Sequence, residues 1–195
     1  DSGYLTQWDK PMFEQVAYKI DVKLLIKRGY LCPVVSNGGG VKVDVSKVKH
    51  KGGEFLDSAL ESLYMSKTVE IVADIVKKGI DRKAWLIFCV SIEHAEQVTA
   101  ELISHGVNTA CYHSQSDNDY ILDDFAQGRL KCLVNVNILT TGSNFPIADM
   151  CVLIRATEST ALYVQIVGRV MRLYPDKKNA LLLDYGSNVL RHGCI

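Results

Sequence analysis

Two arginines near the C-terminal end, Arg169 and Arg172, stand three positions apart and follow Gln165 at helical spacing. On an α-helix, positions i, i+4 and i+7 fall within an arc of roughly 60° at about 100° per residue. Guanidinium groups suit multidentate recognition of phosphate and the stabilisation of charge during phosphoryl transfer. The spacing therefore predicts one helix that presents two guanidiniums and an amide to a phosphate-bearing ligand. The alternative is a solvated helix face whose arginine stems pack on the domain.

Two further features favour the phosphate-binding interpretation. An apolar stripe, centred about 90° from the arginines, would let the same helix pack on a sheet. It consists of Leu162, Ile166, Val170 and Leu173. A turn-forming segment, Leu-Thr-Thr-Gly-Ser-Asn-Phe-Pro, precedes the helix at positions 139–146. Because the turn and the arginine pair occur together in this order, we favour a phosphate site over a solvated face.

The elements that must position this helix alternate along the chain from residue 54 onward. Helical patterns cover 54–78, 91–104 and 120–126. Apolar runs typical of buried strands cover 85–90, 107–113, 130–136, 151–154 and 180–184. Strands that are apolar throughout and alternate with helices indicate an α/β fold with a parallel sheet covered on both faces. Ligand groups in such sheets gather at the carboxyl ends of the strands, where Ser91, His113, Arg155 and residues 137–144 are expected.

Residues 1–50 follow a different pattern. A short helix is expected over 23–28, ended by Gly29. The apolar segments 31–35 and 41–45 flank Ser-Asn-Gly-Gly-Gly and predict a β-hairpin with a flexible turn. No Gly-Lys-Ser or Gly-Lys-Thr follows these glycines, so a phosphate loop is not expected there. We therefore expect a connector with a helix and a hairpin over 1–50, derived from a preceding domain, and an α/β domain over 51–195.

The composition limits the class of protein. A chain of 195 residues, 48% hydrophobic, can bury a full core. Its 22 basic and 22 acidic residues cancel, so any nucleic-acid contact must be local or shared with another domain. The six cysteines form no Cys-x-x-Cys pair, which favours reduced thiols over a disulfide framework or a zinc site. No apolar run reaches the length of a bilayer span and no signal peptide is evident, so we expect a cytoplasmic protein without membrane contact.

The chain resembles the second RecA-like domain of superfamily 2 helicases. The segment 85–97 resembles motif IV of that superfamily, 135–146 resembles motif V and 165–172 resembles motif VI. Further segments are similar to the RadD-like DNA-repair helicases, among them Gly-Tyr-Leu-Thr at 3–6, Glu-His-Ala-Glu at 93–96 and Leu-Asp-Tyr-Gly at 183–186. The resemblance implies a RecA-like parallel sheet with helices on both faces, of the kind found in P-loop NTPases.

This resemblance implies an ATP-driven motor on DNA that holds ATP and Mg²⁺ in a cleft between two RecA-like domains. Arg169 and Arg172 would contact the γ-phosphate across the cleft as catalytic residues, and the sequence does not say which of them is the arginine finger. Gly142, Asn144 and Gln165 would complete the ATP-binding residues of this chain.

The same resemblance implies a nucleic-acid contact at the carboxyl ends of the strands. The residues expected to contact DNA are Ser91, His113, Thr140 and Thr141. Ser91 is also the expected N-cap of the helix 91–104, and the two roles are compatible because a helix start favours phosphate. His113 has the alternative of a surface histidine with a local hydrogen bond. Arg155 either lines the cleft or pairs with Glu158.

The chain departs from the family pattern at two places. Asn144 stands where the family usually has Asp, so it keeps an acceptor but loses the charge that would act on the ribose or its water network. The segment 114–120 is acidic where many relatives carry arginine or lysine, which weakens the expectation of a backbone contact there.

Two parts of an ATPase site are missing from the sequence. It contains neither a Gly-x-x-x-x-Gly-Lys-Ser/Thr phosphate loop nor an Asp-Glu-x-His/Asp box, so the triphosphate and Mg²⁺ have no cradle in it. We therefore expect an upstream RecA-like domain as partner, and little ATP hydrolysis by this chain alone, which holds no metal or cofactor itself. The alternatives are a non-catalytic interaction module with a RecA-like shell and a translocase serving a restriction-type nuclease.

Overall fold

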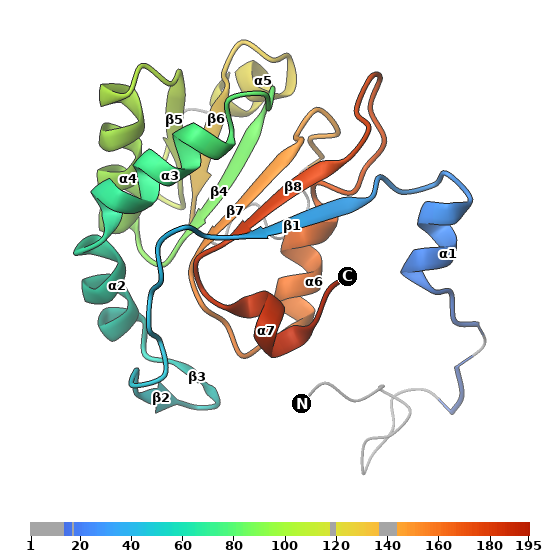
Figure 1. The fold of residues 1–195 in the computed structure, drawn as a ribbon, viewed down its shortest axis with the longest axis horizontal. Helices are drawn as coiled ribbons and strands as arrows, with labels where there is room; N and C mark the ends of the chain where they lie inside the picture. The colour runs from blue at the N-terminus through green and yellow to red at the C-terminus, as the bar shows by residue number, and fades with distance from the viewer. Residues whose placement is uncertain (1–13, 17, 118–119, 137–143) are drawn as a thin grey trace.

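The computed structural model describes residues 14–16, 18–117, 120–136 and 144–195, which form a six-stranded parallel sheet with helices on both faces (Figure 1). In sheet order the strands are β1 (Val34–Gly38), β8 (Ala180–Asp184), β7 (Met150–Ile154), β4 (Trp85–Cys89), β6 (Cys132–Asn135) and β5 (Thr109–Tyr112). All five neighbouring pairs are parallel. The four strands β4, β6, β7 and β8 are buried along their whole length, as their uninterrupted apolar sequences predict.

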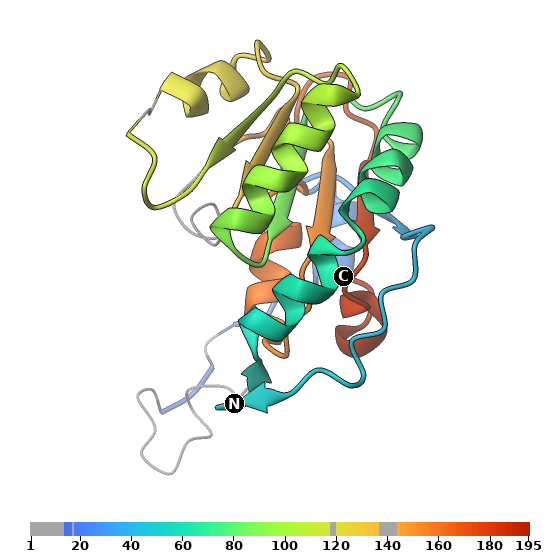
Figure 2. The same ribbon diagram turned by 90° about the vertical axis from the view of Figure 1, so that its left-hand side faces the viewer.

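Successive residues of the central strands point to opposite faces and build two cores. On one face Trp85 and Ile87 pack with α2 (Asp57–Met65), α3 (Thr68–Lys78) and α4 (Ile92–Ser104). On the other face Leu86 and Phe88 pack with α5 (Tyr120–Ala126) and α6 (Thr160–Gly168). Figure 2 shows the sheet between these two helix layers. The predicted α/β fold with a RecA-like sheet is confirmed.

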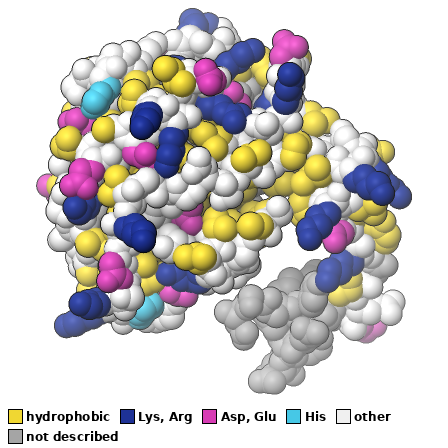
Figure 3. Space-filling view, in the orientation of Figure 1, with side chains coloured by type: hydrophobic (Ala, Val, Ile, Leu, Met, Phe, Trp, Pro, Cys, Tyr) yellow, Lys and Arg dark blue, Asp and Glu magenta, His cyan; other side chains and the backbone are white. Residues whose placement is uncertain are grey.

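Three smaller elements lie at the margins of the sheet. α1 (Val22–Lys27) lies beyond β1, and α7 (Asn188–His192) follows β8 (Figure 1). β2 (His50–Lys51) and β3 (Glu54–Phe55) form a short antiparallel ribbon just before α2. In the view of Figure 3, basic and acidic side chains are interspersed, in keeping with the balanced composition.

The helix expected over 54–78 is wrong as a single element. The structure has two helices, α2 and α3, separated by Ser66 and Lys67. The Ser66 hydroxyl donates to the carbonyl of Leu63 at 2.8 Å, and Lys67 has non-helical dihedrals of φ −116° and ψ 2°. A serine that bonds back to the preceding turn competes with the helical hydrogen bonds. The break allows the two helices to bury Tyr64 and Ile71 in the same core.

The hairpin expected from 31–35 and 41–45 is also wrong. β1 instead pairs in parallel with β8, from Val34 opposite Ala180 to Gly38 opposite Asp184, and residues 41–45 form no strand. A side chain on Gly39 would overlap the ring of Tyr185, and one on Gly40 would overlap the carboxylate of Asp74. The Gly40 amide donates to that carboxylate at 2.7 Å. These glycines are therefore needed for close packing rather than for a chain reversal, and the segment 1–50 supplies a strand to the main sheet.

The cysteines of the described chain are all free thiols. Four of them, Cys32, Cys89, Cys132 and Cys151, are buried. Burial raises the pKa of the Cys132 and Cys151 thiols well above the usual range, which keeps both protonated. In the part of the chain that the structure describes, no helix is long and apolar enough to cross a bilayer.

Candidate functional site

The site residues predicted from the sequence fall at two opposite ends of the sheet. Ser91 follows β4 and His113 follows β5, so both lie at the carboxyl ends of the strands. Asn144, Arg169 and Arg172 lie near the other end, because they belong to the segments that lead into the amino ends of β7 and β8. The expected position of Asn144 at the carboxyl ends of the strands is therefore wrong. α6 connects the two ends. Thr140, Thr141 and Gly142 lie outside the described residues.

Ser91 is the N-cap of α4, as predicted. Its hydroxyl accepts from the backbone amide of His94 at 3.2 Å, and it also donates to the carboxylate of Glu61 from α2. A serine cap satisfies an amide that the first helical turn leaves unpaired. The Glu61 carboxylate places a negative charge at the helix start, where a phosphate would otherwise be favoured. The contact of Ser91 with DNA stays a prediction.

His113 makes local contacts at the end of β5. Its Nδ1 accepts from the backbone amide of Gln115 at 3.3 Å, and its Nε2 lies 3.9 Å from Oε1 of Glu96. The backbone amide of His113 donates to the Ser116 hydroxyl at 3.0 Å. The local hydrogen bond that was the alternative for this histidine is therefore present, and its contact with DNA stays a prediction.

The helix that carries the arginines is shorter than predicted. α6 ends at Gly168, so Arg169 is its C-cap and Arg172 lies beyond it. The amides of Arg169 and Val170 donate to carbonyls three positions back at 3.1 Å, which tightens the last turn. The carbonyl of Met171 accepts from the Cys32 amide at 2.7 Å, which ties the chain after α6 to the N-terminal segment. The single helix face through Arg172 is therefore wrong, and Leu173 of the expected apolar stripe is 52% exposed.

The arginines are nevertheless brought together with Asn144, and we call these three residues the arginine end. A guanidinium nitrogen of Arg172 donates to the side-chain carbonyl of Asn144. Arg169 is half-buried next to Arg172, whereas Gln165, one turn earlier on α6, is exposed. The segments that resemble motif V and motif VI therefore meet through a direct side-chain contact. The Asn144 acceptor that replaces the family's Asp is used for this contact.

The electrostatics of the arginine end fit a polyanionic ligand. Burial lowers the pKa of the Arg169 guanidinium, and the positive charge of Arg172 lowers it further. Two like charges held side by side repel each other, and an anion lying against both would offset that repulsion. A triphosphate has the charge and the multiple acceptors that two guanidiniums recognise. No group of three His, Cys, Asp or Glu side chains that could hold a metal ion occurs within residues 14–16, 18–117, 120–136 and 144–195.

Two residues that hold the arginine end were missed from the sequence. Phe145, next to Asn144, is buried and packs edge-on against Phe125 with ring centroids 5.2 Å apart. Lys177 donates through Nζ to the backbone carbonyls of Pro146, Ala148 and Arg172. A pattern search could have flagged Phe145 as the apolar residue of the turn, but Lys177 looks like any surface lysine beside Lys178.

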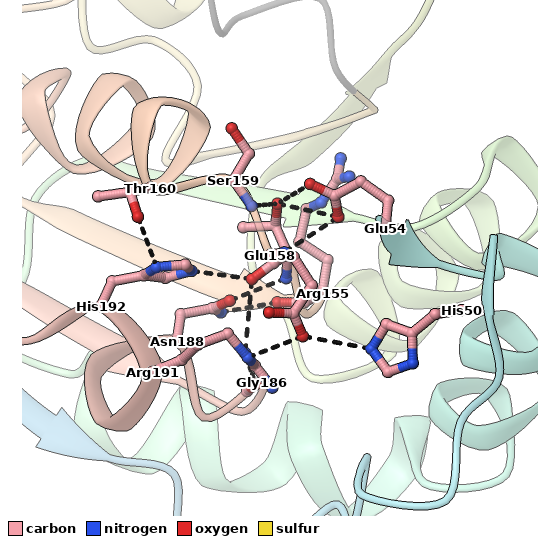
Figure 4. Close-up of polar contacts among 11 residues, drawn as sticks. His50, Glu54, Arg155, Glu158, Ser159, Thr160, Gly186, Asn188, Arg191 and His192 are labelled. Carbon is pink, nitrogen blue, oxygen red and sulfur yellow. Dashed lines mark hydrogen bonds and ion pairs between the residues drawn. The ribbon is translucent and has the colours of Figure 1, made fainter. Parts of the chain in front are cut away.

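The start of α6 is held by a second group of residues, which we call the start cluster: Glu54, Thr157, Glu158, Ser159 and Asn188 (Figure 4). Glu54 of β3 accepts from the Thr157 hydroxyl at 3.1 Å and from the Glu158 amide at 3.0 Å. Asn188 of α7 accepts from the Thr157 amide at 3.0 Å. Ser159 caps α6 by accepting from the Leu162 amide at 3.2 Å. Two separate segments, β3 and α7, thus fix the loop that leads into the helix.

Charged and aromatic side chains surround this cluster. The Glu158 carboxylate lies 3.1 Å from Nε of Arg191 and 3.3 Å from Nε2 of His50. His192 bonds through Nε2 to the Thr157 carbonyl at 2.8 Å and through Nδ1 to the Thr160 hydroxyl at 3.0 Å. Since a carbonyl can only accept, Nε2 of His192 donates to it. Figure 4 shows these contacts joining the ribbon, the loop and α7.

Arg155 lies beneath the start cluster, at the carboxyl end of β7. Only 8% of its surface is exposed, and it lines a pocket of about 490 Å³ together with Glu54, Asp57 and Leu162. Burial lowers the pKa of its guanidinium, and the nearby Asp57 and Glu54 act in the opposite direction. Of the two roles predicted, the structure shows Arg155 lining a pocket, while Glu158 is engaged by Arg191 and His50.

Known proteins resemble this chain in sequence and in fold. A protein of Saccharomyces cerevisiae (strain ATCC 204508 / S288c) named as an ATP-dependent helicase, IRC3, is 27% identical over 183 residues, which cover 89% of this chain and 26% of that protein. The chain thus spans about a quarter of the length of this relative. A fragment described as an HsdR subunit of a type I restriction enzyme from Vibrio vulnificus YJ016 has the same fold, with a TM-score of 0.69 at 24% identity over 87% of this chain and 35% of that one.

A second solved structure matches a smaller share of this chain. The C-terminal domain of the DEAD-box protein Dbp5 matches with a TM-score of 0.54 at 21% identity, over 65% of this chain and 74% of that one. Residues 67–174, from the start of α3 to just beyond the arginine end, match the family described as the helicase conserved C-terminal domain. The chain therefore belongs to the family of helicase conserved C-terminal domains and has the RecA-like fold of that family.

Proposed function

We propose that this chain is the second RecA-like domain of an ATP-dependent superfamily 2 DNA helicase or translocase and supplies half of an ATP site between two such domains. The contact between Asn144 and Arg172 is the observation that carries this proposal, because it joins the two phosphate-binding segments of the sequence at one place. Arg169 and Arg172 would stabilise charge on the transferred phosphoryl group, one of them as the arginine finger. Asn144, Gln165 and Gly142 would contact the nucleotide.

The partner in this proposal is a RecA-like domain that carries a phosphate loop and an acidic box. Such a domain would hold ATP and Mg²⁺, and the guanidiniums of this chain would reach the triphosphate from across the cleft. Support comes from the relative named as an ATP-dependent helicase, of which this chain covers only 26%. On this proposal the chain alone hydrolyses little ATP.

The nucleic acid in this proposal is DNA, and it would lie at the carboxyl ends of the strands. Ser91, His113, Thr140 and Thr141 are the proposed contacts. The similarity to RadD-like DNA-repair helicases noted in the sequence supports DNA over RNA and a role in repair within the cytoplasm. Ser91 and His113 do lie at this end of the sheet, which is compatible with a shared backbone contact, although the Glu61 carboxylate would have to turn away from Ser91.

DNA-stimulated ATPase activity tests this proposal directly. The measurement requires the polypeptide that contains this chain together with its phosphate-loop domain, as wild type and as Arg169→Ala and Arg172→Ala. Loss of turnover in both variants, with DNA binding retained, would support the proposal. Absence of a phosphate loop from the rest of the polypeptide, or near-wild-type turnover in both variants, would instead favour a non-catalytic interaction module.

A further inference from the structure

Lys177 is the residue whose contacts the proposed function leaves unexplained. It lies in the connection between α6 and β8, after Pro175. Its Nζ is 3.2 Å from the carbonyl of Pro146, 2.6 Å from that of Ala148 and 2.9 Å from that of Arg172. An ammonium group has three donors, so these three carbonyls use its full capacity.

These three acceptors belong to the two segments that form the arginine end. Pro146 and Ala148 follow Asn144, and the third carbonyl is that of Arg172 itself. Asn144 and Arg172 also meet through their side chains. Arg172 is therefore held twice, through its carbonyl by Lys177 and through its guanidinium by Asn144. Of these two contacts, only the one through Lys177 fixes the backbone position from which the guanidinium extends.

The environment of the Lys177 ammonium differs from that of an ordinary surface lysine. Burial lowers the pKa of the Lys177 ammonium, because part of its hydration is lost. The hydrogen bonds that replace water are all to uncharged carbonyls. A lysine used only for surface solubility would keep its ammonium in water, as its neighbour Lys178 does, since Lys178 is exposed.

We propose that Lys177 is a positioning residue of the ATP site, which sets the separation of the segments that carry Asn144 and Arg172 so that the Arg172 guanidinium meets the transferred phosphate. This inference rests on the proposed role of Arg172. Lys177 does not reach the ligand and acts only through the backbone that it joins. Displacement of a catalytic group by about 1 Å can lower a rate by about a hundredfold.

A double-mutant cycle on kcat tests this role in the polypeptide that contains both RecA-like domains. Lys177→Met, which has a similar length but no donors, is expected to lower kcat by about tenfold to a hundredfold while KM for ATP changes by less than about threefold. Combining Lys177→Met with Arg172→Ala should lower kcat no further than Arg172→Ala alone, because the lysine acts through that arginine. Lys178→Met is the matched control and should leave kcat and KM unchanged.

Two results would overturn the inference. One is a full kcat in Lys177→Met, and the other is a double variant whose loss equals the product of the two single losses. If Lys177→Met fails to fold, Lys177→Arg replaces it. The planar guanidinium keeps the charge but cannot direct three donors from a single nitrogen to the three carbonyls. Near-wild-type turnover in both Arg169→Ala and Arg172→Ala would instead refute the proposed function, so the two failures are distinguishable.

Discussion

The two ends of α6 differ in how their polar groups are used. At its start, the start cluster bonds loop amides and hydroxyls to a carboxylate from β3 and an amide from α7, and Ser159 caps the first turn. At its other end, two half-buried guanidiniums lie beside each other, and Arg172 contacts an uncharged side chain. The start thus has the partners that a stable fold needs, whereas the arginine end concentrates positive charge.

The difference indicates that the groups important for stability and the groups proposed for activity lie at opposite ends of α6. Groups at the start are bonded within the chain, so their removal should cost folding free energy. Charge at the arginine end is balanced best by an external anion, so its removal should cost activity with little effect on folding. Four predictions test this separation.

The largest effect is expected at the arginine end. Arg169→Ala and Arg172→Ala should each lower kcat/KM for ATP by at least about a hundredfold, because the charge on the phosphate groups would lose a stabilising partner. The finger variant should lower kcat, and the variant of a ground-state phosphate ligand should mainly raise KM. Melting temperatures should stay within about 2 °C of the wild type. A large drop in melting temperature with intact turnover would show that the arginine end contributes to stability and not to activity.

A pH effect is expected where a buried polar group lacks the partners that the start cluster has. His94 is 0% exposed, stacks on Tyr64, and has no hydrogen-bond partner for either ring nitrogen among the described residues. Burial lowers the pKa of His94 from 6.5 to about 4, against an opposing effect of Glu61. Its folded pKa is below the unfolded one, so the stability it contributes is complete above pH 6.5 and is lost as the pH falls toward 4.

Thermal or urea unfolding at different pH values checks this expectation. Between pH 7 and pH 5 the free energy of unfolding should fall by about 2 kcal/mol on account of His94, at about 1.36 kcal/mol per pKa unit. His94→Leu should remove this part of the slope, and the remaining slope reports the carboxylates. An identical slope in the variant would show that His94 is not buried in its neutral form.

Two glycines, one near each end of α6, are expected to change the free energy of unfolding in opposite directions when each is replaced by alanine. A side chain on Gly186 would overlap the backbone carbonyl of Arg155 beneath the start cluster, whereas one on Gly168, the last residue of α6, meets nothing within 4 Å. Gly186→Ala should therefore lower the free energy of unfolding by about 1–3 kcal/mol. Gly168→Ala should leave it unchanged or raise it by up to about 1 kcal/mol, since alanine favours helix. Equal changes in the free energy of unfolding of the two variants, measured by urea unfolding, would contradict this expectation.

The smallest effect is expected from the helix cap. Ser159→Ala removes the hydroxyl that accepts from the Leu162 amide, and should cost about 1 kcal/mol of folding free energy. Ser104→Ala, at the far end of α4, is the control and should change stability by less than about 0.5 kcal/mol. Chemical denaturation measures both. If Ser159→Ala lowered turnover more than stability, the start of α6 would have to be counted with the active site.

Local sequence signals predicted much of this molecule correctly. The apolar runs around Trp85 and Leu182 became buried parallel strands, and Ser91 became a helix cap, because each depends on a few neighbouring residues. The predicted hairpin is absent because β1 pairs with β8, a strand more than a hundred positions away. No local sequence pattern can reveal such a partner. The end of α6 was misplaced because the amides of Arg169 and Val170 bond to carbonyls three positions back, and the following residue Met171 is tied to the distant Cys32.

The candidate site was predictable only in part for the same reason. The spacing of Arg169 and Arg172 is visible in the sequence, and the family resemblance assigned them to one site with Asn144, which contacts Arg172 in the structure. Lys177 and Glu54 act by reaching backbone groups of other segments, so their residue types gave no signal. Roles defined by long-range hydrogen bonds emerge only when the chain is folded.

The amide at position 144 has a consequence for how Arg172 changes partners. In the resting domain the guanidinium is bonded to a neutral oxygen, and a phosphate that arrives can take over that donor. A carboxylate in the same place would then be left facing a negatively charged substrate, and their repulsion would oppose the exchange. With asparagine, the released oxygen can be solvated by water at little cost. If Arg172 binds phosphate as proposed, asparagine at position 144 thus lowers the electrostatic barrier to moving the guanidinium from Asn144 to the phosphate.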